Sequence, residues 1–582
     1  MIFSILLFTV SSYSQIYVAP GGSDGNPGTF MEPLATIPAA VIKAQPGDTI
    51  YLRGGTYTLS TTITISRDGS ESSRFYLSAF NYERPLLNFS SMAVSSSNRG
   101  IRLSGDYWHV KGINIKGAGD NGMNVSGSNN IIEFCSFFEN RDTGLQLSGG
   151  ASNNQIINCD SYFNADPDNG DADGFAPKLD VGSGNYFYGC RAWQNSDDGW
   201  DGYLRPSNDI NTTLENCWCF ANGYLKNGNP SSGNGNGYKM GGSDDRTLMH
   251  NFTLKNCIAF DNRVKGFDQN NNKGSMIIYN SSAYRNGTNY SITSPLNAGK
   301  TAEIINGLSL GAFGSLGAFV AQQTNSWQSS FNVAADDFIS IDTSGVRGPR
   351  NADGSLPDIN FLHLAPGSDL INGGTDVGLP FAGSAPDLGA FETGLNVPVE
   401  LTAFSASVSG ELIVLNWTTA TELNNYGFEI QKKFVNEFTT VGFVKGSGSS
   451  VEQHQYHFID KNIAPGFNSY RLRQIDFNGS SSYSNEIRIN FNGPYKFNLS
   501  QNYPNPFNPV TLISFSLAEN EPVSLLIYNM LGEKAAVLID NEMKEPGYYK
   551  LNFNAENLSS GTYFYVLRQG EKMLSKKMIL IK

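Results

Sequence analysis

Short runs in which apolar and polar residues alternate recur through the first half of the chain. Each run ends at an asparagine, and the same pattern returns in the next run. The runs are IIEFCSFFEN, QIINCDSYFN, NYFYGCRAWQN, LENCWCFAN, LKNCIAFDN and IIYNSSAYRN. Alternation of this kind predicts β-strand structure followed by a turn.

Cysteine and asparagine mark equivalent positions in these runs. In five runs a cysteine is followed five residues later by asparagine, and Ser281 with Asn286 continues the series. The intervals of 24, 31, 27, 40 and 24 residues each fit one coil of a solenoid, the longer ones with added loops. We therefore predict a parallel β-helix in which the turn asparagines hydrogen-bond along the stack. The pairs are Cys135 and Asn140, Cys159 and Asn164, Cys190 and Asn195, Cys217 and Asn222, and Cys257 and Asn262.

The six cysteines, which include Cys219, raise the question of disulfides. An even number in a secreted chain is typical of a disulfide framework. Equivalent positions in successive coils instead favour thiols that stack in the core as small apolar side chains, although one oxidised pair stays open.

Other stretches predict the ends of the solenoid. The amphipathic stretch Leu34 to Ala44 is expected to cap one end, since terminal repeats need a cover. Arg74 to Leu86 and Trp108 to Ile115 are expected to begin the regular coils. Residues 361–374 and 385–392 resemble closing coils.

Length and net charge limit the number of domains and the kinds of partner that the chain can have. A chain of 582 residues with 62 glycines and 16% charged residues is expected to hold several β-rich domains. The net charge of −13 argues against a nucleic-acid partner, and it would repel an acidic polysaccharide unless a metal ion or local basic residues offset it.

The chain start and its hydropathy bear on location. Residues 1–14 form a short apolar run that ends in small residues, which predicts a signal peptide without the usual basic start; a buried first strand is the alternative. No later run is long and apolar enough to span a bilayer, so we expect a soluble or surface-attached protein.

Acidic residues crowd the stretch from Asp171 to Asp201. Asp173 stands 24 residues before Asp197, about one coil, and Asp198 and Asp201 follow within one turn, so the four are expected to share a face. Like charges in one site raise each other's pKa unless a cation neutralises them. Oxygen ligands favour Ca²⁺, and Mg²⁺ less strongly. The simpler interpretation is a pair of surface turns in which aspartate supports the backbone and glycine supplies a positive φ.

Four motifs carry a closer resemblance. DADGFAPKL, GCRAWQNSDDGWD, GNGYKMGG and KGFDQNNN resemble the signature of polysaccharide lyase family 9, the pectate lyases built on a right-handed parallel β-helix, over roughly residues 16–393. The resemblance implies a catalytic Ca²⁺ and a lysine base. It places the metal ligands at Asp173, Asp197, Asp198 and Asp201, and the base at Lys239.

The implied reaction is β-elimination. A base removes the C5 proton of a uronate, and the glycosidic oxygen leaves C4 without water. Lys239 must be neutral for this role, and calcium would lower its pKa while the aspartates would raise it. We expect an alkaline optimum. The simpler interpretation of Lys239 is a solvated turn residue.

Further basic and polar residues are weaker candidates. We expect some to contact substrate, although each could be solvated or structural: Lys178, Arg205, Arg263, Lys265, Asp268, Gln269 and Asn270. Asp166, Asp168 and Asp171 could hold a second calcium ion.

Two further blocks follow a composition change near residues 394–400. Residues 397–492 predict a β-sandwich with Trp417 in its core, similar to fibronectin-type linkers, with a carbohydrate-binding module as the alternative. Residues 496–582, opening with QNYPNPFNP, resemble the type A C-terminal sorting domain of the type IX secretion system, with a plain β-sandwich as the alternative. The resemblance implies export across a Gram-negative outer membrane, then surface retention or release.

The sequence therefore predicts an all-β protein: a right-handed parallel β-helix at 16–393 followed by two small β-sandwich domains. We expect a monomer that acts on an acidic polysaccharide such as polygalacturonate, with rhamnogalacturonan still open. Two rival functions remain, a pectin-directed glycoside hydrolase on the same fold and a non-catalytic adhesin stiffened by calcium.

Overall fold

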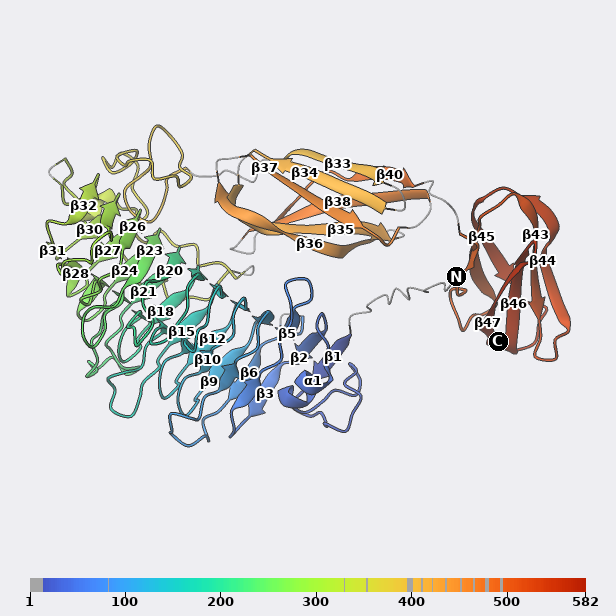
Figure 1. Ribbon diagram of the computed structural model, residues 1–582, viewed down its shortest axis with the longest axis horizontal. Helices are drawn as coiled ribbons and strands as arrows, with labels where there is room; N and C mark the ends of the chain where they lie inside the picture. The colour runs from blue at the N-terminus through green and yellow to red at the C-terminus, as the bar shows by residue number, and fades with distance from the viewer. Residues whose placement is uncertain are drawn as a thin grey trace, which may run out of the picture. The chain divides into compact units, whose positions relative to one another are not determined.

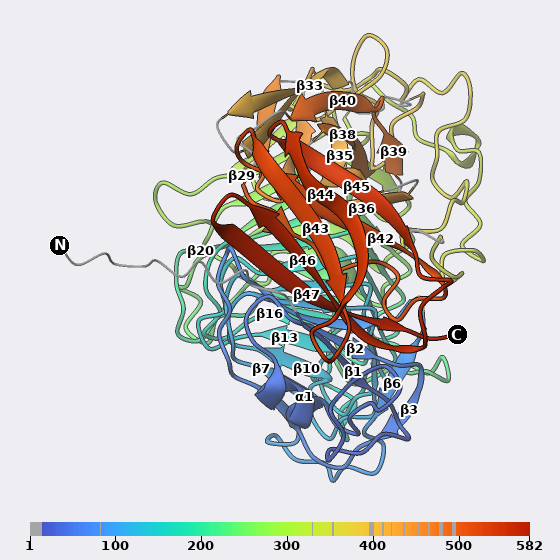
Figure 2. The same ribbon diagram turned by 90° about the vertical axis from the view of Figure 1, so that its right-hand side faces the viewer.

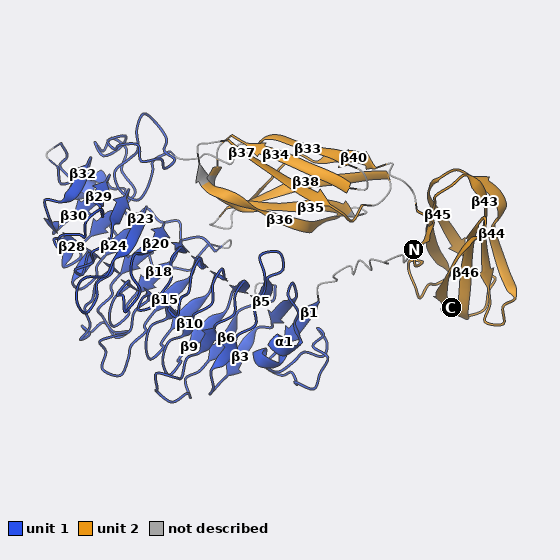
Figure 3. Cartoon of the chain, viewed as in Figure 1, with its two compact units in different colours: residues 1–396, 477–480 blue, residues 397–476, 481–582 orange. Residues whose placement is uncertain are grey.

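The computed structural model describes residues 14–582 apart from 82, 329, 352–353, 395–400, 410–411, 421, 435–436, 451–452, 464–465, 477–480 and 492–495. The chain divides into two compact units, residues 1–396 with 477–480 and residues 397–476 with 481–582 (Figure 3). All but the last residue of the predicted signal peptide lies outside the described residues. Within the part of the chain that is described, no helix is both long enough and apolar enough to cross a membrane.

The first unit is a β-helix whose coils stack one on the next from β1 to β32 (Figure 1). Three parallel sheets form its walls. The first sheet contains β1 (Gln15–Val18), β2 (Thr49–Leu52), β5 (Phe75–Ala79), β8 (Trp108–Lys111), β11 (Ile131–Glu133), β14 (Gln155–Ile157), β17 (Asn185–Tyr188), β20 (Ile210–Glu215), β23 (His250–Lys255), β26 (Met276–Tyr279), β29 (Ala302–Ile305) and β32 (Val320–Gln323). The predicted parallel β-helix is confirmed.

The other two walls have ten strands each. The second sheet contains β3 (Gly55–Thr58), β6 (Pro85–Asn88), β9 (Asn114–Lys116), β12 (Ser136–Phe138), β15 (Asp160–Tyr162), β18 (Arg191–Trp193), β21 (Trp218–Phe220), β24 (Ile258–Phe260), β27 (Ser282–Tyr284) and β30 (Leu308–Leu310). The third, called the site sheet below, contains β4 (Ile63–Ile65), β7 (Ile101–Leu103), β10 (Met123–Val125), β13 (Leu145–Leu147), β16 (Phe175–Pro177), β19 (Trp200–Asp201), β22 (Tyr238–Lys239), β25 (Lys265–Asp268), β28 (Thr288–Ile292) and β31 (Gly314–Leu316).

Each repeated run forms two short strands with a corner between them, not one strand. The cysteine lies at that corner, and the residue before it adopts a left-handed backbone conformation, for example φ 54° at Phe134 and φ 51° at Asn158. Asparagine tolerates this conformation better than most residues, which explains its frequency there. All six thiols are buried and free, so the predicted core stack is confirmed and none is oxidised.

The turn asparagines form the predicted ladder. Asn140 Nδ2 donates to Asn164 Oδ1 at 2.9 Å, and Asn164 Nδ2 donates to Asn195 Oδ1 at 2.8 Å. The series continues through Asn222, Asn262, Asn286 and Asn289 at 2.9–3.0 Å. Because every member is buried, each hydrogen bond satisfies polar atoms that have no access to water.

The solenoid is filled by side chains and closed by a helix at one end. Phe175, Trp200, Tyr238, Phe267 and Tyr290 stack inside the site sheet with ring centroids 4.8–5.2 Å apart. The short helix α1 (Ile37–Lys43), at the end where β1 lies (Figures 1 and 2), buries three residues against the core, as the amphipathic stretch predicted. Regular coils begin before Arg74, since β1, β2 and β5 already pair in register.

The stretches expected to close the far end do something else. Residues 361–374 and 385–392 contain no named strand, and their apolar side chains pack with a satellite cluster on the second sheet. Phe361 packs against Phe260 with centroids 4.7 Å apart, and Arg350 reaches back to Asp160 at 2.7 Å. The expectation of closing coils was wrong, because these apolar residues cover the outer face of the second sheet and do not enter the core.

The second unit contains four antiparallel sheets. Residues 401–491 form β33 (Leu401–Ser409), β34 (Leu412–Thr419) and β37 (His454–Asp460) in one sheet, and β35 (Glu422–Phe434), β36 (Glu437–Ser450), β38 (Gly466–Asp476), β39 (Ser481–Tyr483) and β40 (Ile487–Phe491) in the other. Trp417 is buried between them, as predicted. The last block contains β41 (Asn498–Leu499), β42 (Val510–Leu517), β43 (Glu521–Tyr528), β44 (Lys534–Lys544), β45 (Gly547–Asn554), β46 (Gly561–Gln569) and β47 (Lys572–Leu580).

Candidate active site

The acidic cluster is built from the residue that precedes a glycine at the start of successive strands of the site sheet. Thr143, Asp173, Asp198 and Asn236 hold this position in four consecutive coils. The side chains of Thr143, Asp173 and Asp198 each accept a hydrogen bond from the backbone N–H of the same position in the next coil, from Asp173 N to Thr143 Oγ1 at 3.2 Å to Asn236 N to Asp198 Oδ1 at 2.8 Å. One carboxylate oxygen is thereby fixed and the other is left for a further contact.

The glycine in this position is required by close packing. A Cβ added to Gly199 would lie 1.9 Å from Cys219 Sγ, and one added to Gly174 would lie 2.7 Å from the carbonyl oxygen of Gly199. Neither glycine has a positive φ. The simpler interpretation, in which these glycines supply a positive φ to surface turns, is therefore wrong.

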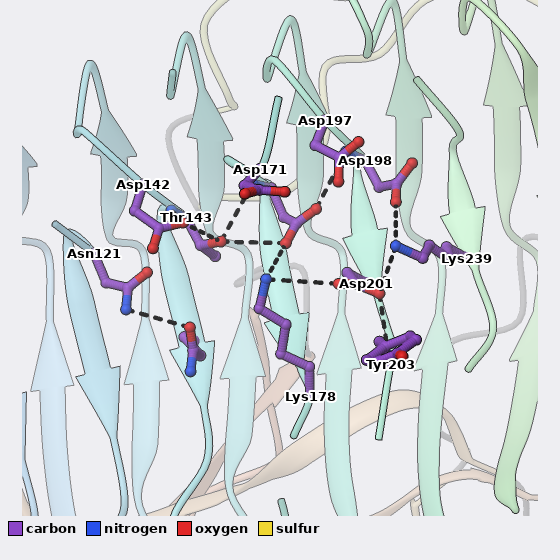
Figure 4. A network of polar contacts seen from close by, with 12 residues as sticks. Asn121, Asp142, Thr143, Asp171, Lys178, Asp197, Asp198, Asp201, Tyr203 and Lys239 are labelled. Carbon is purple, nitrogen blue, oxygen red and sulfur yellow. Dashed lines mark hydrogen bonds and ion pairs between the residues drawn. The ribbon is translucent and has the colours of Figure 1, made fainter. Parts of the chain in front are cut away.

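Three carboxylates converge at the start of β16 and β19 (Figure 4). Asp173, Asp197 and Asp198 each offer an oxygen within 4.8 Å of the others, and all three are buried. Asp201 lies on β19, where its two oxygens face two lysines. The coil spacing thus brings the predicted residues together across one strand-to-strand step.

Two lysines complete the cluster. Lys239 Nζ lies 3.1 Å from Asp198 Oδ2 and 3.3 Å from Asp201 Oδ1. Lys178 Nζ lies 2.7 Å from Asp173 Oδ2 and 3.5 Å from Asp201 Oδ2. Asp201 therefore sits between the two ammonium groups, as Figure 4 shows. The register pairs Asp201 with Lys239 and Lys239 with Asp268, so outward-facing positions of β19, β22 and β25 align.

Burial and charge set the protonation of the carboxylates. Burial, together with neighbouring carboxylates, raises the pKa of Asp173 to about 7 and that of Asp197 to about 9. Burial also raises the pKa of Asp198. At Asp201 burial acts in the same direction, but Lys239 and Lys178 outweigh it and lower the pKa. In the metal-free site Asp197 is therefore protonated at neutral pH, because burial and the neighbouring carboxylates disfavour its ionised form.

The carboxylates also control the lysine. Burial favours the neutral amine of Lys239, but Asp201 and Asp198, with smaller contributions from Asp173 and Asp197, outweigh it. They hold the pKa of Lys239 well above its usual range. The sequence left this direction open, and in the metal-free site the aspartates decide it.

Loop residues missed by the sequence reasoning hold the cluster in place. The backbone N–H of Asn234 donates to Asp197 Oδ1, and its side chain donates to Asp197 Oδ2 at 3.3 Å. Thr143 donates to Asp173 Oδ2 at 3.2 Å. Thr143 could have been found by aligning the residue before each glycine, whereas Asn234 gives no sequence signal because its loop has no repeat.

Tyr203 was also missed. Its backbone N–H donates to Asp201 Oδ1 at 3.0 Å, and the Lys239 ammonium lies 5.8 Å from its ring centroid. Its hydroxyl donates to Asp244, which also pairs with Arg205 at 2.7 Å. Arg205, a predicted substrate contact, is thus exposed near the base and anchored by Asp244.

The remaining predicted contacts differ in their surroundings. Lys265 pairs with Asp268 at 2.9 Å on β25, beside Lys239 in the sheet. Gln269 is buried and bonds to the backbone of Asn272 and Ser294. Asn270 has φ 46° and donates to the carbonyl oxygen of Gly241 at 3.0 Å. The side chains of Gln269 and Asn270 therefore already hydrogen-bond to the backbone of neighbouring turns.

Arg263 and the second acidic group are not members of the carboxylate triad, which is Asp173, Asp197 and Asp198. Arg263 donates to the carbonyl oxygen of Gly233 and lines a shallow pocket of about 480 Å³. Asp166 accepts hydrogen bonds from the backbone of Asp168, Gly170 and Asp171. Among the described residues, the only cluster of three acidic, histidine or cysteine ligands suited to a metal is the triad.

Two known protein families match separate parts of the chain. The region described as "Pel9A-like, right handed beta helix region" matches residues 16–303, and a "Secretion system C-terminal sorting domain" matches residues 501–582. The C-terminal block is therefore a sorting domain, which indicates export through the type IX system.

Relatives and solved structures match the β-helix. Pectate lyase L of Dickeya chrysanthemi is 41% identical over 396 residues, covering 66% of this chain and 91% of that protein. Pectate lyase L of Paenibacillus polymyxa is 43% identical, covering 64% and 86%. The crystal structure of pectate lyase Pel9A matches with a TM-score of 0.62 and 39% identity, covering 66% and 97%. A rhamnogalacturonan lyase matches with a TM-score of 0.55 and 26% identity, covering 61% and 97%.

Both the site and these matches agree with the four motifs. The chain belongs to the Pel9A-like family of right-handed β-helix polysaccharide lyases.

Proposed function

We propose that this protein is a calcium-dependent lyase that cleaves polygalacturonate by β-elimination. The observation that carries the proposal is the position of Lys239, whose ammonium lies 3.1 Å from Asp198 and 3.3 Å from Asp201 beside a buried carboxylate triad. A basic group and a metal-binding group are then adjacent, as removal of a proton next to a carboxylate requires. The relatives named pectate lyase favour pectate over rhamnogalacturonan.

The residues present fit a calcium ion. Three buried carboxylates within 4.8 Å supply hard oxygen ligands, and Asn236 Oδ1 beside them is a buried oxygen that accepts no hydrogen bond from a described residue. Asp173, Asp197 and Asp198 would hold the ion, with Asp201 as the fourth ligand. Bound calcium would supply positive charge that neutralises the aspartates and draws the substrate carboxylate into the site.

Lys239 is the base in this proposal. Its neutral amine takes the C5 proton of the uronate, the C5–H electrons form the C4–C5 double bond, and the C4–O bond breaks with its electrons on the leaving oxygen. Asp201 and Tyr203 hold the Lys239 side chain against the sheet. Because the aspartates keep this lysine protonated in the metal-free site, we expect turnover to rise toward alkaline pH.

Other side chains would orient the polymer. The side chain of Lys178 is 15% exposed and lies next to Asp173 and Asp201, so we propose that it holds the carboxylates in place and meets a substrate carboxylate. We also propose three substrate contacts near Lys239. Asp268 pairs with Lys239 in the sheet and binds Lys265, and Arg205 shares Asp244 with Tyr203. Gln269, Asn270 and Arg263 donate hydrogen bonds to backbone carbonyl groups, and we propose that they fix the loops beside the site.

We propose three mature domains, at 16–393, 397–492 and 496–582, after a signal peptide at 1–14. The division of the chain between residues 396 and 397 supports the first boundary. The middle domain links the lyase to the sorting domain, and the exported enzyme acts as a monomer outside the cell, retained on the surface or released.

The test is the ultraviolet absorbance of unsaturated products when the full chain meets polygalacturonate with calcium or with a chelator. Absorbance that requires calcium supports the proposal. Reducing ends without absorbance would indicate hydrolysis, and no product from any acidic glycan would favour the adhesin.

A further inference from the structure

The outward face of one sheet in the middle domain gathers arginine and aromatic side chains. Tyr470 and Leu472 of β38 are buried, so Arg471 and Arg473 between and beyond them point outward. Neither matched family region includes this domain. We call this surface the Arg471 face, and its described members are Gln431, Lys433, Phe438, Phe467, Arg471, Arg473, Tyr483 and Arg488.

Arg471 is clamped between two rings. Its guanidinium carbon lies 4.0 Å from the ring centroid of Phe438 and 4.1 Å from that of Tyr483. Its Nε donates to Gln431 Oε1 at 2.9 Å. No described residue accepts a hydrogen bond from its terminal nitrogens. The planar donor group is therefore held in place by stacking while its outer edge stays free, a geometry that suits a carboxylate.

The surrounding charges favour an anion. Lys433 is paired with Glu486 and Arg473 with Glu429, both at 3.3 Å. Arg471 and Arg488 form no ion pair with any described residue. The face thus carries a local positive excess in a chain whose net charge is −13.

Exposed rings lie beside these cations. Tyr483 is 54% exposed and Phe467 is 62% exposed, with the Arg488 guanidinium 3.8 Å from the Phe467 ring centroid. Apolar rings of this exposure next to fixed donors can pack on the carbon face of a sugar while the donors bind its acidic group.

We infer that the Arg471 face is a second binding site for an acidic polysaccharide, in which Arg471 binds a uronate carboxylate and the exposed rings pack on sugar residues. The inference rests on the proposed function for the identity of the polymer, a polyuronate. The face offsets the repulsion between an acidic enzyme and an acidic polymer, and so keeps the enzyme on its substrate between cleavage events.

The test is affinity electrophoresis of the full chain through gels that contain polygalacturonate or a neutral polysaccharide, with chelator present to suppress cleavage. We expect polygalacturonate to retard the protein, and Arg471→Gln to weaken the association about three- to tenfold. Arg471→Lys, which keeps the charge but loses the planar fork, should weaken it as well. Lys461→Gln is the matched control, because it removes one positive charge from an exposed position of the same domain.

The outcomes separate the inference from the proposed function. Equal retardation of Arg471→Gln, Lys461→Gln and the unchanged chain overturns the inference, whatever the lyase assay gives. Retardation that depends on Arg471 in a protein without elimination activity supports the face and rejects the function. Since Arg471 lies outside the β-helix, turnover of short oligogalacturonates should be the same in the variant, and a loss there would count against a separate site.

Discussion

At the scale of single residues, the site depends on which buried groups carry charge. Two lysines share Asp201, while among the described residues the Asp197 carboxylate accepts hydrogen bonds from Asn234 alone. The uneven placement gives each residue a distinct expected effect when it is replaced.

Replacing the proposed base separates catalysis from folding. Lys239→Ala should lower turnover on polygalacturonate by about 10²- to 10⁴-fold, because general base catalysis contributes that much. Calcium binding measured by calorimetry should persist, since the carboxylates remain. Lys226→Ala, at an exposed lysine paired with Glu139, is the control and should keep full activity. Retained activity in Lys239→Ala would assign the base elsewhere.

The raised carboxylate pKa values give the metal-free protein a defined pH dependence. The folded-state pKa of Asp173 is about 7 and that of Asp197 about 9, both above the ordinary 3.8. A group whose pKa is higher in the folded state than in the unfolded state stabilises the fold at pH values below its unfolded-state pKa. This stabilisation is lost as the pH rises through the folded-state pKa. With chelator, the melting temperature should therefore fall between pH 5 and pH 9, and calcium should restore it.

Asp197→Asn checks the origin of that slope. The variant removes one group that titrates near pH 9, so its melting temperature should change less between pH 7 and pH 9. A slope identical to that of the unchanged chain would place the effect outside the triad.

At the scale of elements, stability comes from columns that run across coils. Asn195 donates to Asn222 and to the carbonyl oxygen of Ser161, and it accepts from Asn164. Asn195→Ala should lower the free energy of unfolding by about 2 kcal/mol, since it leaves buried partners unsatisfied. Denaturant unfolding measures the loss. Asn227→Ala, in an exposed turn, should lower the free energy of unfolding much less. Equal losses in the two variants would mean that the asparagine ladder does not contribute more to stability than an exposed asparagine.

Side chains that align across successive coils explain which parts of the fold could be predicted from the sequence. Cysteine and asparagine repeats revealed the coils, and Asp173 to Asp201 revealed one face of the cluster. The division of each run into two strands was not predicted. The corner between the strands requires one residue with a left-handed backbone, and residues as different as Phe134 and Asn158 adopt that conformation, so no common residue type marks it. The stretch with Phe361 was misplaced because its apolar residues cover the outside of a sheet, which a local pattern cannot distinguish from a coil.

At the scale of the whole molecule, catalysis and export lie in different blocks. Removing residues 496–582 should leave calcium-dependent elimination intact in purified protein, since all site residues lie in the β-helix. In a Gram-negative host with a type IX system, the truncated enzyme should remain inside the cell. Product assays on culture fluid and on cell fractions measure both effects. Full export of the truncated chain would show that the sorting domain is dispensable.

Sequence placed the domains more readily than their contacts. The resemblance of the tail rests on motifs along the whole block, whereas the Arg471 face depends on β36, β38 and β39 coming together. Phe438 and Tyr483 lie far from Arg471 in sequence, and only the antiparallel register brings the three side chains into one stack.

The position before each strand glycine has an evolutionary consequence. Since its occupant is polar and hydrogen-bonds to the next coil, exchanging it for another polar residue of similar size should not disturb the apolar core. Asn121 and Asn236 occupy the same position as Asp173 and Asp198, and asparagine becomes aspartate by a single nucleotide change. A lineage could therefore move its metal centre by one coil, toward Asn236, while the scaffold, and the export signal attached to it, stayed as they are.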